Sequence, residues 1–165
     1  MNVKLVKVWV RRVGALLLAA AVFLSFHADA SAVPSVDAPT KHIELSLSQQ
    51  QMVAWEGDRR VFQFAVTTGQ EGQETLPGQY EILDKEADAY SEGWQLKMPF
   101  WLGIYQFGDY ENGFHALPSD DAGNVYWADA LGKFPASHGC IVLSAADAEK
   151  LFDWATVGTT VDIHE

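Results

Sequence analysis

Apolar and polar residues alternate along much of this chain from position 41 onward, and that spacing predicts β-strands. Ile43, Leu45 and Leu47 alternate with polar neighbours, and two further apolar runs follow at 52–55 and 61–66. A glycine-containing turn separates the last two runs. Short runs joined by tight turns are typical of neighbouring antiparallel strands, so the first third of the domain is predicted to be a meander.

The middle of the chain predicts further strands separated by turns and loops. A Pro-Gly turn introduces a strand at 79–83, and the polar segment 84–92 is expected to be a loop. Aromatic-rich strands follow at 94–98 and 100–107, with an interruption at Pro99. The aromatic density favours core packing, and an apolar wall of a binding cleft is the alternative, which does not exclude the first.

Residues 109–113 form a predicted turn that precedes a strand carrying Phe114 and His115. The stretch 116–136 contains several prolines and glycines, and it is the longest irregular segment that the pattern predicts. A loop of this length inside a compact domain is usually functional or mobile, so we expect it to cover a site. Residues 125–128 within it are compatible with a short strand or a helical turn.

The only clear helical pattern lies near the C-terminus. Ser144 and Asp147 match a capping box, which predicts a helix start. The helix is expected over 145–155, because apolar residues recur at i, i+3, i+4 and i+7 from Ala148. Alternation at 160–163 predicts a closing strand. Together these patterns predict a mainly β domain with one conspicuous helix.

The first 30 residues have the pattern of a secretory signal peptide. Basic residues precede an apolar run at 13–26, and Ala28-Asp29-Ala30 fits a small-x-small cleavage site. The run is shorter than the roughly 18 to 20 residues that a spanning helix needs, so an uncleaved anchor is the weaker alternative. We therefore expect a signal peptide at 1–30, a linker at 31–40 and one domain at 41–165.

Charge narrows the choice of partners. The whole chain has a formal net charge of −11. Removing residues 1–30 takes away four of the 11 basic residues and one of the 22 acidic residues, which leaves −14. Such a charge argues against nucleic acid or an anionic membrane surface as a partner and favours solubility. We expect an exported protein that is periplasmic, cell-wall associated or extracellular.

Cys140 is the only cysteine in 165 residues and cannot form an internal disulfide. It is either a small buried apolar group or a reactive thiol. Gly139 permits a sharp turn, so its amide and that of Cys140 could converge on an oxyanion. His115, 25 residues upstream, is the candidate base, and its pairing is expected to lower the thiol pKa. Ser137 and His138 are candidates for supporting roles.

The same residue types also occur in other kinds of site. Two histidines and a cysteine could ligate zinc, but the spacing of His138 and Cys140 is unfavourable, and we expect no metal and no cofactor. The glycine-rich segment 69–74 lacks the Lys-Ser/Thr and the helix of a phosphate-binding loop, so it is expected to be an ordinary surface loop. His42 and His164 are expected to face solvent without a chemical role.

The sequence Ser-His-Gly-Cys-Ile-Val-Leu-Ser at 137–144, with the apolar histidine segment 114–118, resembles the catalytic signature of the YkuD-type L,D-transpeptidase family. Three further segments support the resemblance. Residues 41–50 resemble the opening strand and turn of the family, residues 75–78 its T-P-x-G loop, and residues 157–161 its closing strand. The resemblance therefore spans most of the predicted domain.

This resemblance implies a single mixed, β-sandwich-like catalytic domain with one short helix after the nucleophile. It also implies a cysteine acyltransferase acting on peptidoglycan stem peptides, with Cys140 as nucleophile and His115 as general base and acid. A thioester would be transferred to an amine acceptor to form a cross-link. The alternatives are an L,D-carboxypeptidase that hydrolyses the same bond and, from another class, a non-catalytic β module that binds the cell wall.

Two positions depart from the family pattern. Ala116 stands where the family usually has glycine, and Val142 stands where it usually has arginine. An arginine fork binds a carboxylate through two hydrogen bonds and valine cannot, so carboxylate recognition is expected to differ. Either Arg59, Arg60 or Lys133 replaces the missing arginine, or the preferred stem has an amidated carboxylate.

Overall fold

The structure, a computed structural model, describes residues 40–165. The predicted signal peptide and nearly all of the predicted linker lie outside the described residues. Within this range the chain forms nine β-strands and one α-helix, which confirms the mainly β class. The strands are β1 (Lys41–Ser46), β2 (Gln51–Glu56), β3 (Arg59–Thr67), β4 (Gly78–Glu81), β5 (Asp84–Ser91), β6 (Leu96–Phe107), β7 (Tyr110–Ala116), β8 (Ile141–Leu143) and β9 (Thr160–His164), and the helix is α1 (Ala145–Trp154).

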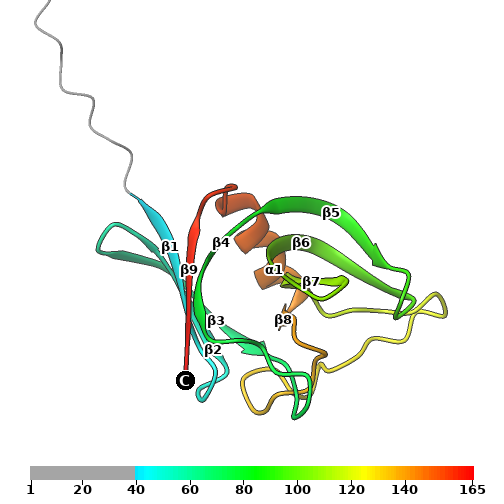
Figure 1. The fold of residues 1–165 in the computed structure, drawn as a ribbon. Helices are drawn as coiled ribbons and strands as arrows, with labels where there is room; N and C mark the ends of the chain where they lie inside the picture. Colours follow the sequence, from blue (N-terminus) through cyan, green and yellow to red (C-terminus); the bar gives the residue numbers. More distant parts are fainter. Residues whose placement is uncertain (1–39) are drawn as a thin grey trace, which may run out of the picture. The chain divides into compact units, whose positions relative to one another are not determined.

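All nine strands belong to one curled, mixed sheet in the order β4-β9-β1-β2-β3-β8-β7-β6-β5 (Figure 1). β1, β2 and β3 form the predicted antiparallel meander. Two pairings are parallel: β9 with β1, and β8 with β7. The second parallel pair matters for the site, because it sets the strand of His115 beside the strand that begins directly after Cys140.

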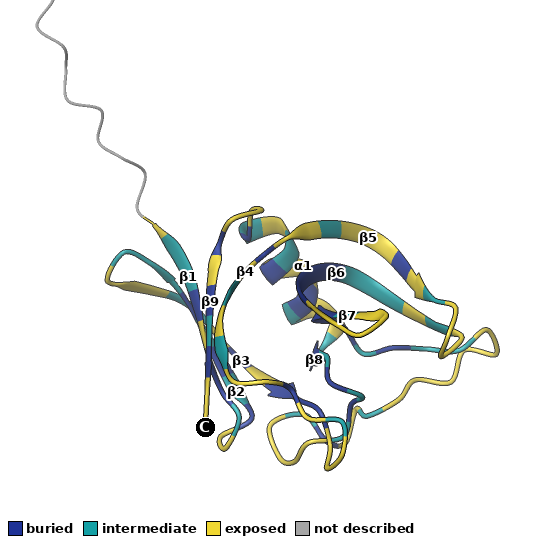
Figure 2. Ribbon diagram, in the orientation of Figure 1, coloured by how far each residue is buried: buried dark blue, intermediate teal, exposed yellow. Residues whose placement is uncertain are grey.

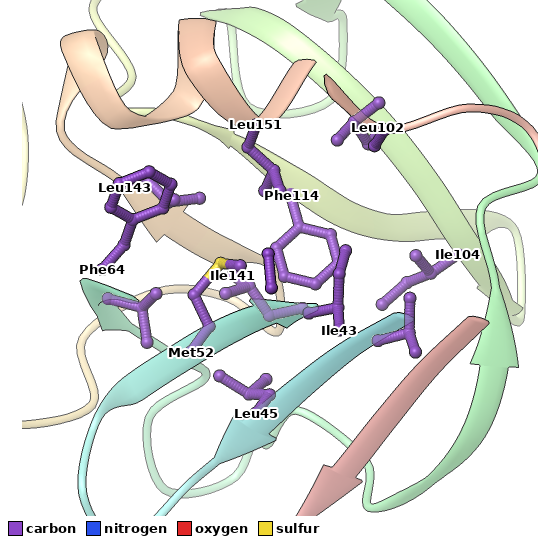
Figure 3. Close-up of a cluster of buried hydrophobic side chains, with 14 of the residues drawn as sticks. Ile43, Leu45, Met52, Phe64, Leu102, Ile104, Phe114, Ile141, Leu143 and Leu151 are labelled. Carbon is purple, nitrogen blue, oxygen red and sulfur yellow. The ribbon is translucent and has the colours of Figure 1, made fainter. Parts of the chain in front are cut away.

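The core lies between the meander side of the sheet and the β6–β8 side, with α1 packed on β6, β7 and β8. Successive side chains of a strand point to opposite faces, so each strand contributes every second residue. Ile43 of β1, Phe114 of β7 and Leu151 of α1 are fully buried and meet in this cluster (Figure 3). No helix of residues 40–165 is long and apolar enough to cross a membrane.

Helix α1 begins where the capping box predicts. The Ser144 hydroxyl accepts a hydrogen bond from the Asp147 amide at 3.2 Å and donates one to the Asp147 carboxylate at 2.7 Å. The C-terminal carbonyls are bound by lysines from distant strands. Lys41 of β1 donates to the Trp154 carbonyl at 2.6 Å, and Lys85 of β5 donates to the Ala155 carbonyl at 2.6 Å. Cations at this end of a helix complement its dipole, so α1 is held at both ends.

Two predictions about the middle of the chain were wrong. Residues 84–92 were expected to be a loop, but Asp84–Ser91 forms the edge strand β5. Most of its side chains are exposed, so it lacks the apolar alternation that identifies a strand. The predicted break at Pro99 is also absent, because β6 runs without interruption and Pro99 pairs with Asp88. A positive φ of 61° at Phe100 accommodates the irregularity within the strand.

The predicted turn at 109–113 is shorter than expected, because β7 already begins at Tyr110. Gly113 therefore lies inside a strand, and a Cβ there would come within 2.3 Å of the Leu102 carbonyl oxygen. Glycine at this position allows the close approach of β6.

The irregular stretch predicted at 116–136 is present, and residues 125–128 contribute one isolated bridge, between Ser119 and Val125. β8 is buried along its length, whereas much of this loop is exposed (Figure 2).

Candidate active site

Cys140 sits at the end of a loop whose backbone is fixed by two hydroxyl groups. Ser137 is fully buried, and its hydroxyl donates to the Cys140 carbonyl at 2.6 Å and accepts from the Gly139 amide at 3.2 Å. The Thr75 hydroxyl donates to the Gly139 carbonyl at 2.7 Å. The Gly139 amide was expected to face an oxyanion, but here it is bonded within the loop. Ser137 therefore has a supporting position, and the Cys140 amide is the remaining oxyanion candidate.

Gly139 occupies a position that only glycine adopts without strain. Its φ is +115°, and a Cβ would lie 2.9 Å from the Asn112 amide oxygen. The same oxygen accepts a hydrogen bond from the Cys140 thiol at 3.5 Å. The glycine thus lets the loop approach β7 closely enough for Asn112 to reach the sulfur.

His115 lies on β7 and is 2% exposed. Its register partner on β8 is Val142. Nδ1 lies 2.6 Å from the Ala116 carbonyl oxygen. Because a carbonyl oxygen only accepts, Nδ1 carries the proton of the neutral ring, and Nε2 carries the lone pair. The ring also stacks on Trp101, with centroids 5.9 Å apart. The base candidate is therefore fixed in one tautomer and one orientation.

Burial shifts both candidate groups toward their neutral forms. It lowers the pKa of His115 to about 4, against a smaller opposing effect of the Ala116 carbonyl. It raises the pKa of Cys140 to about 11, against a smaller opposing effect of a hydrogen bond from the Gly113 backbone; the negative charge of Glu111 raises it slightly further. The expectation that pairing lowers the thiol pKa was wrong, because loss of hydration outweighs the other effects. At neutral pH the site holds a thiol and an imidazole, not a thiolate and an imidazolium.

Cys140 and His115 line one cavity of about 340 Å³. Asn112 and Glu111 lie on its wall, and most of the remaining lining is apolar or aromatic. The aromatic segment around β6 serves both suggested purposes. Some of its side chains, such as Met98, line the cavity, and others, such as Trp101 and Ile104, are buried. A pocket of this kind suits an extended ligand with few polar groups near the thiol.

His138 joins two segments at the cavity. The centroid of its ring lies 3.9 Å from the ring centroid of Trp94, which belongs to the segment between β5 and β6. It lies 5.3 Å from the ring centroid of Trp127, and these two rings meet edge to face. Trp127 belongs to the long irregular loop between β7 and β8, so that loop does reach the site. Burial lowers the pKa of His138, which favours a neutral ring at neutral pH. His138 therefore packs between aromatic rings in the cavity that Cys140 also lines.

The cavity involves one predicted loop but none of the basic residues proposed to bind a carboxylate. Residues 69–74 form a mostly exposed loop, as predicted, and Gly72 and Glu74 of this loop line the cavity. Arg59, Arg60 and Lys133 were candidates for a substrate carboxylate, yet none lines it. Arg59 instead pairs with Glu56, and Arg60 donates to Gln63 at 2.8 Å. Among residues 40–165 there is no group of three or more side chains that could hold a metal ion.

The family model for the L,D-transpeptidase catalytic domain (YkuD) matches residues 40–163. This chain belongs to the L,D-transpeptidase catalytic domain family. The match covers most of the chain and includes every residue of the cavity described above. A comparison with curated proteins finds no match.

Solved structures of this family have the same fold. An L,D-transpeptidase from Stackebrandtia nassauensis is 26% identical with a TM-score of 0.61, covering 76% of this chain and 56% of that one. One from Mycobacterium tuberculosis H37Rv is 24% identical with a TM-score of 0.64, covering 77% and 58%. L,D-transpeptidase 3 from Mycobacterium tuberculosis, in complex with a faropenem-derived adduct, is 22% identical with a TM-score of 0.63, covering 77% and 61%. This chain thus spans less than two thirds of each of them.

Sequence reasoning missed several residues of this L,D-transpeptidase domain. Asn112 and Glu111 belong to a Glu-Asn-Gly sequence, which is a strong local turn signal, and they were assigned to a turn. Trp94 was expected only as part of an aromatic strand. Thr75 was singled out for its likeness to a family loop, without its bond to the Gly139 carbonyl. Each of these contacts joins segments far apart in the sequence, so no local pattern announces it.

Proposed function

We propose that this chain is a cysteine-dependent L,D-transpeptidase that acts on peptidoglycan stem peptides. The observation that carries the proposal is that Cys140 and His115 line the same cavity, with Nε2 of His115 unprotonated. A nucleophile and a correctly held base in one pocket are the parts that acyl transfer needs. Membership of the family supports the choice of substrate.

The first step forms the acyl-enzyme. Cys140 Sγ attacks the carbonyl carbon between the L-centre of a diamino acid and D-alanine, while His115 Nε2 takes the thiol proton. A pKa of about 4 for the imidazole and about 11 for the thiol opposes a resting ion pair. The proton therefore moves as the sulfur attacks. The Ala116 carbonyl, bonded to Nδ1, stabilises the imidazolium that forms.

The tetrahedral intermediate then collapses. We assign the Cys140 amide to its oxyanion, since the Gly139 amide is bonded to Ser137. His115 returns its proton to the leaving amine, the C–N bond breaks, and D-alanine departs from the thioester. An amine of a second stem then attacks the thioester and forms the cross-link. Water in place of the amine gives a trimmed stem, which is the carboxypeptidase alternative.

The long loop between β7 and β8 favours transfer over hydrolysis. Pro118 and Trp127 from this loop line the cavity beside the thiol. Water competes with the amine acceptor for the thioester and is far more concentrated. A loop that excludes water from the site therefore favours attack by a positioned amine. We also propose that the protein is exported, on the basis of the signal-peptide pattern of residues 1–30.

Mass spectrometry of the protein incubated with purified tetrapeptide stems tests the function directly. We expect a thioester adduct on Cys140, release of D-alanine and a cross-linked dimer. Cys140→Ala should lose all three while keeping its thermal unfolding temperature. Faropenem offers an independent probe, since a relative is known with a faropenem-derived adduct. Turnover by Cys140→Ala would refute the cysteine mechanism. Stem binding by the intact protein without any release of D-alanine would refute the enzyme and favour the wall-binding module.

A further inference from the structure

Glu111 lines the cavity, and the carboxyl group of Asp84 lies close to it. Side chains alternate along β7, so Glu111 and His115 project from the same face of that strand. A Cβ built on Gly103 of β6 would lie 2.5 Å from the Glu111 carboxyl oxygen Oε1 and 2.8 Å from Asp84 Oδ1. The two carboxyl groups therefore occupy the space that a side chain at position 103 would fill.

This pair is held in place and retains negative charge. Asp84 Oδ1 accepts a hydrogen bond from the Trp101 indole at 3.1 Å, and Trp101 in turn stacks on His115. Burial, the charge of Asp84 and a hydrogen bond between the two groups all raise the pKa of Glu111. The negative charge of Glu111 acts on the reacting thiol, whose pKa it raises.

Within residues 40–165, the cavity lining has no positive group to balance this charge. Its carboxyl and imidazole side chains are Glu74, Glu111, His115 and His138, and it contains no lysine or arginine. Both imidazoles have a lowered pKa, so they are neutral at neutral pH. Val142, which replaces the usual arginine, is fully buried. The lining is thus negative beside the thiol, which favours a cationic group of a substrate.

We propose that Glu111, held by Asp84, is the specificity residue that recruits the ammonium group of the acceptor stem to the thioester on Cys140. The proposal rests on the transpeptidase function above. The donor's thioester is uncharged, whereas the amine of an acceptor arrives protonated. A half-buried carboxylate beside the thiol therefore discriminates the acceptor from water, which carries no charge.

The transfer step conserves protons and bonds. The recruited ammonium releases one proton to solvent and becomes an amine. Its lone pair attacks the thioester carbonyl, the C–N bond forms, and the C–S bond breaks. The second proton passes from nitrogen to His115 Nε2 and then to the departing sulfur, which restores the thiol. Glu111 binds and positions the acceptor and takes no part in these proton transfers.

The test separates recruitment from thioester formation by using two acceptors. One is a stem with a charged amine, and the other is hydroxylamine, which is uncharged at neutral pH. Pre-formed thioester is offered both acceptors, and the ratio of cross-link to hydroxamate is measured by mass spectrometry. We expect Glu111→Gln to lower this ratio roughly 10- to 100-fold, the range for a lost hydrogen bond to a charged group. The hydroxamate yield per thioester should stay the same.

Glu86→Gln is the matched control, because it removes one carboxylate from β5 outside the cavity. Its ratio should equal that of the unchanged protein, and Asp84→Asn should give an intermediate loss. If the protein without substitutions forms cross-links and Glu111→Gln has the same ratio of cross-link to hydroxamate, this inference alone is overturned. Equal loss with both acceptors in Glu111→Gln also overturns it. A protein that forms the thioester yet never cross-links overturns both this inference and the transpeptidase function.

Discussion

The buried imidazole of His115 is expected to make the fold sensitive to mild acid. Its pKa is about 4 in the folded protein and about 6.5 in an unfolded chain. Between these values the unfolded chain binds the extra proton and the folded protein does not. Stability from this group is therefore present above pH 6.5 and is lost as the pH falls toward 4.

The magnitude follows from the two pKa values. Linkage gives a loss of about 2 kcal/mol in the free energy of unfolding between pH 7 and pH 5, and about 3 kcal/mol in total below pH 4. His115 is 2% exposed, so solvent screening reduces this little. For a domain of this size, 2 kcal/mol corresponds to a fall of roughly 6–10 °C in the unfolding temperature.

Urea denaturation at pH 7 and pH 5 measures the effect, with His115→Gln as the reference protein. Glutamine keeps a donor for the Ala116 carbonyl but does not titrate, and the carboxyl groups that titrate in the same range are common to both proteins. The difference between the two pH-dependent losses therefore isolates His115. His115→Asn serves the same purpose if glutamine is not tolerated. Equal losses in both proteins, or an NMR titration of His115 near 6.5, would refute the reasoning.

Three further predictions concern the loop that contains Gly139, the long loop between β7 and β8, and cleavage of the signal peptide. Gly139→Ala should lower the unfolding free energy by about 1–3 kcal/mol and slow alkylation of Cys140, because its Cβ meets Asn112 at 2.9 Å and its φ is +115°; unchanged alkylation would contradict this. Deleting part of 120–127 should shift the products from cross-links to trimmed stems while the thioester still forms, and an unchanged product ratio would count against a cover. Peptide sequencing of the exported protein should find a terminus near Ser31, and a membrane-embedded protein that keeps Met1 would contradict export.

The sequence by itself determined the elements whose signal is local. Alternation identified β1, and short apolar runs bounded by turns identified β2 and β3. The capping box identified the start of α1, since Ser144 and Asp147 lie within one turn. Cys140 stood out as a lone thiol after a glycine. In each case a few neighbouring residues contain the whole physical cause.

Only the tertiary structure decided what depends on distant partners. β5 is a strand because β6 pairs with it, although most of its side chains face water. The parallel pairing of β7 with β8 sets the strand of His115 beside the strand that follows Cys140. Burial then fixes both groups as neutral, an effect that depends on hydration and not on sequence neighbours. The carboxyl pair of Asp84 and Glu111 likewise arises where separate strands bring like charges together over a glycine.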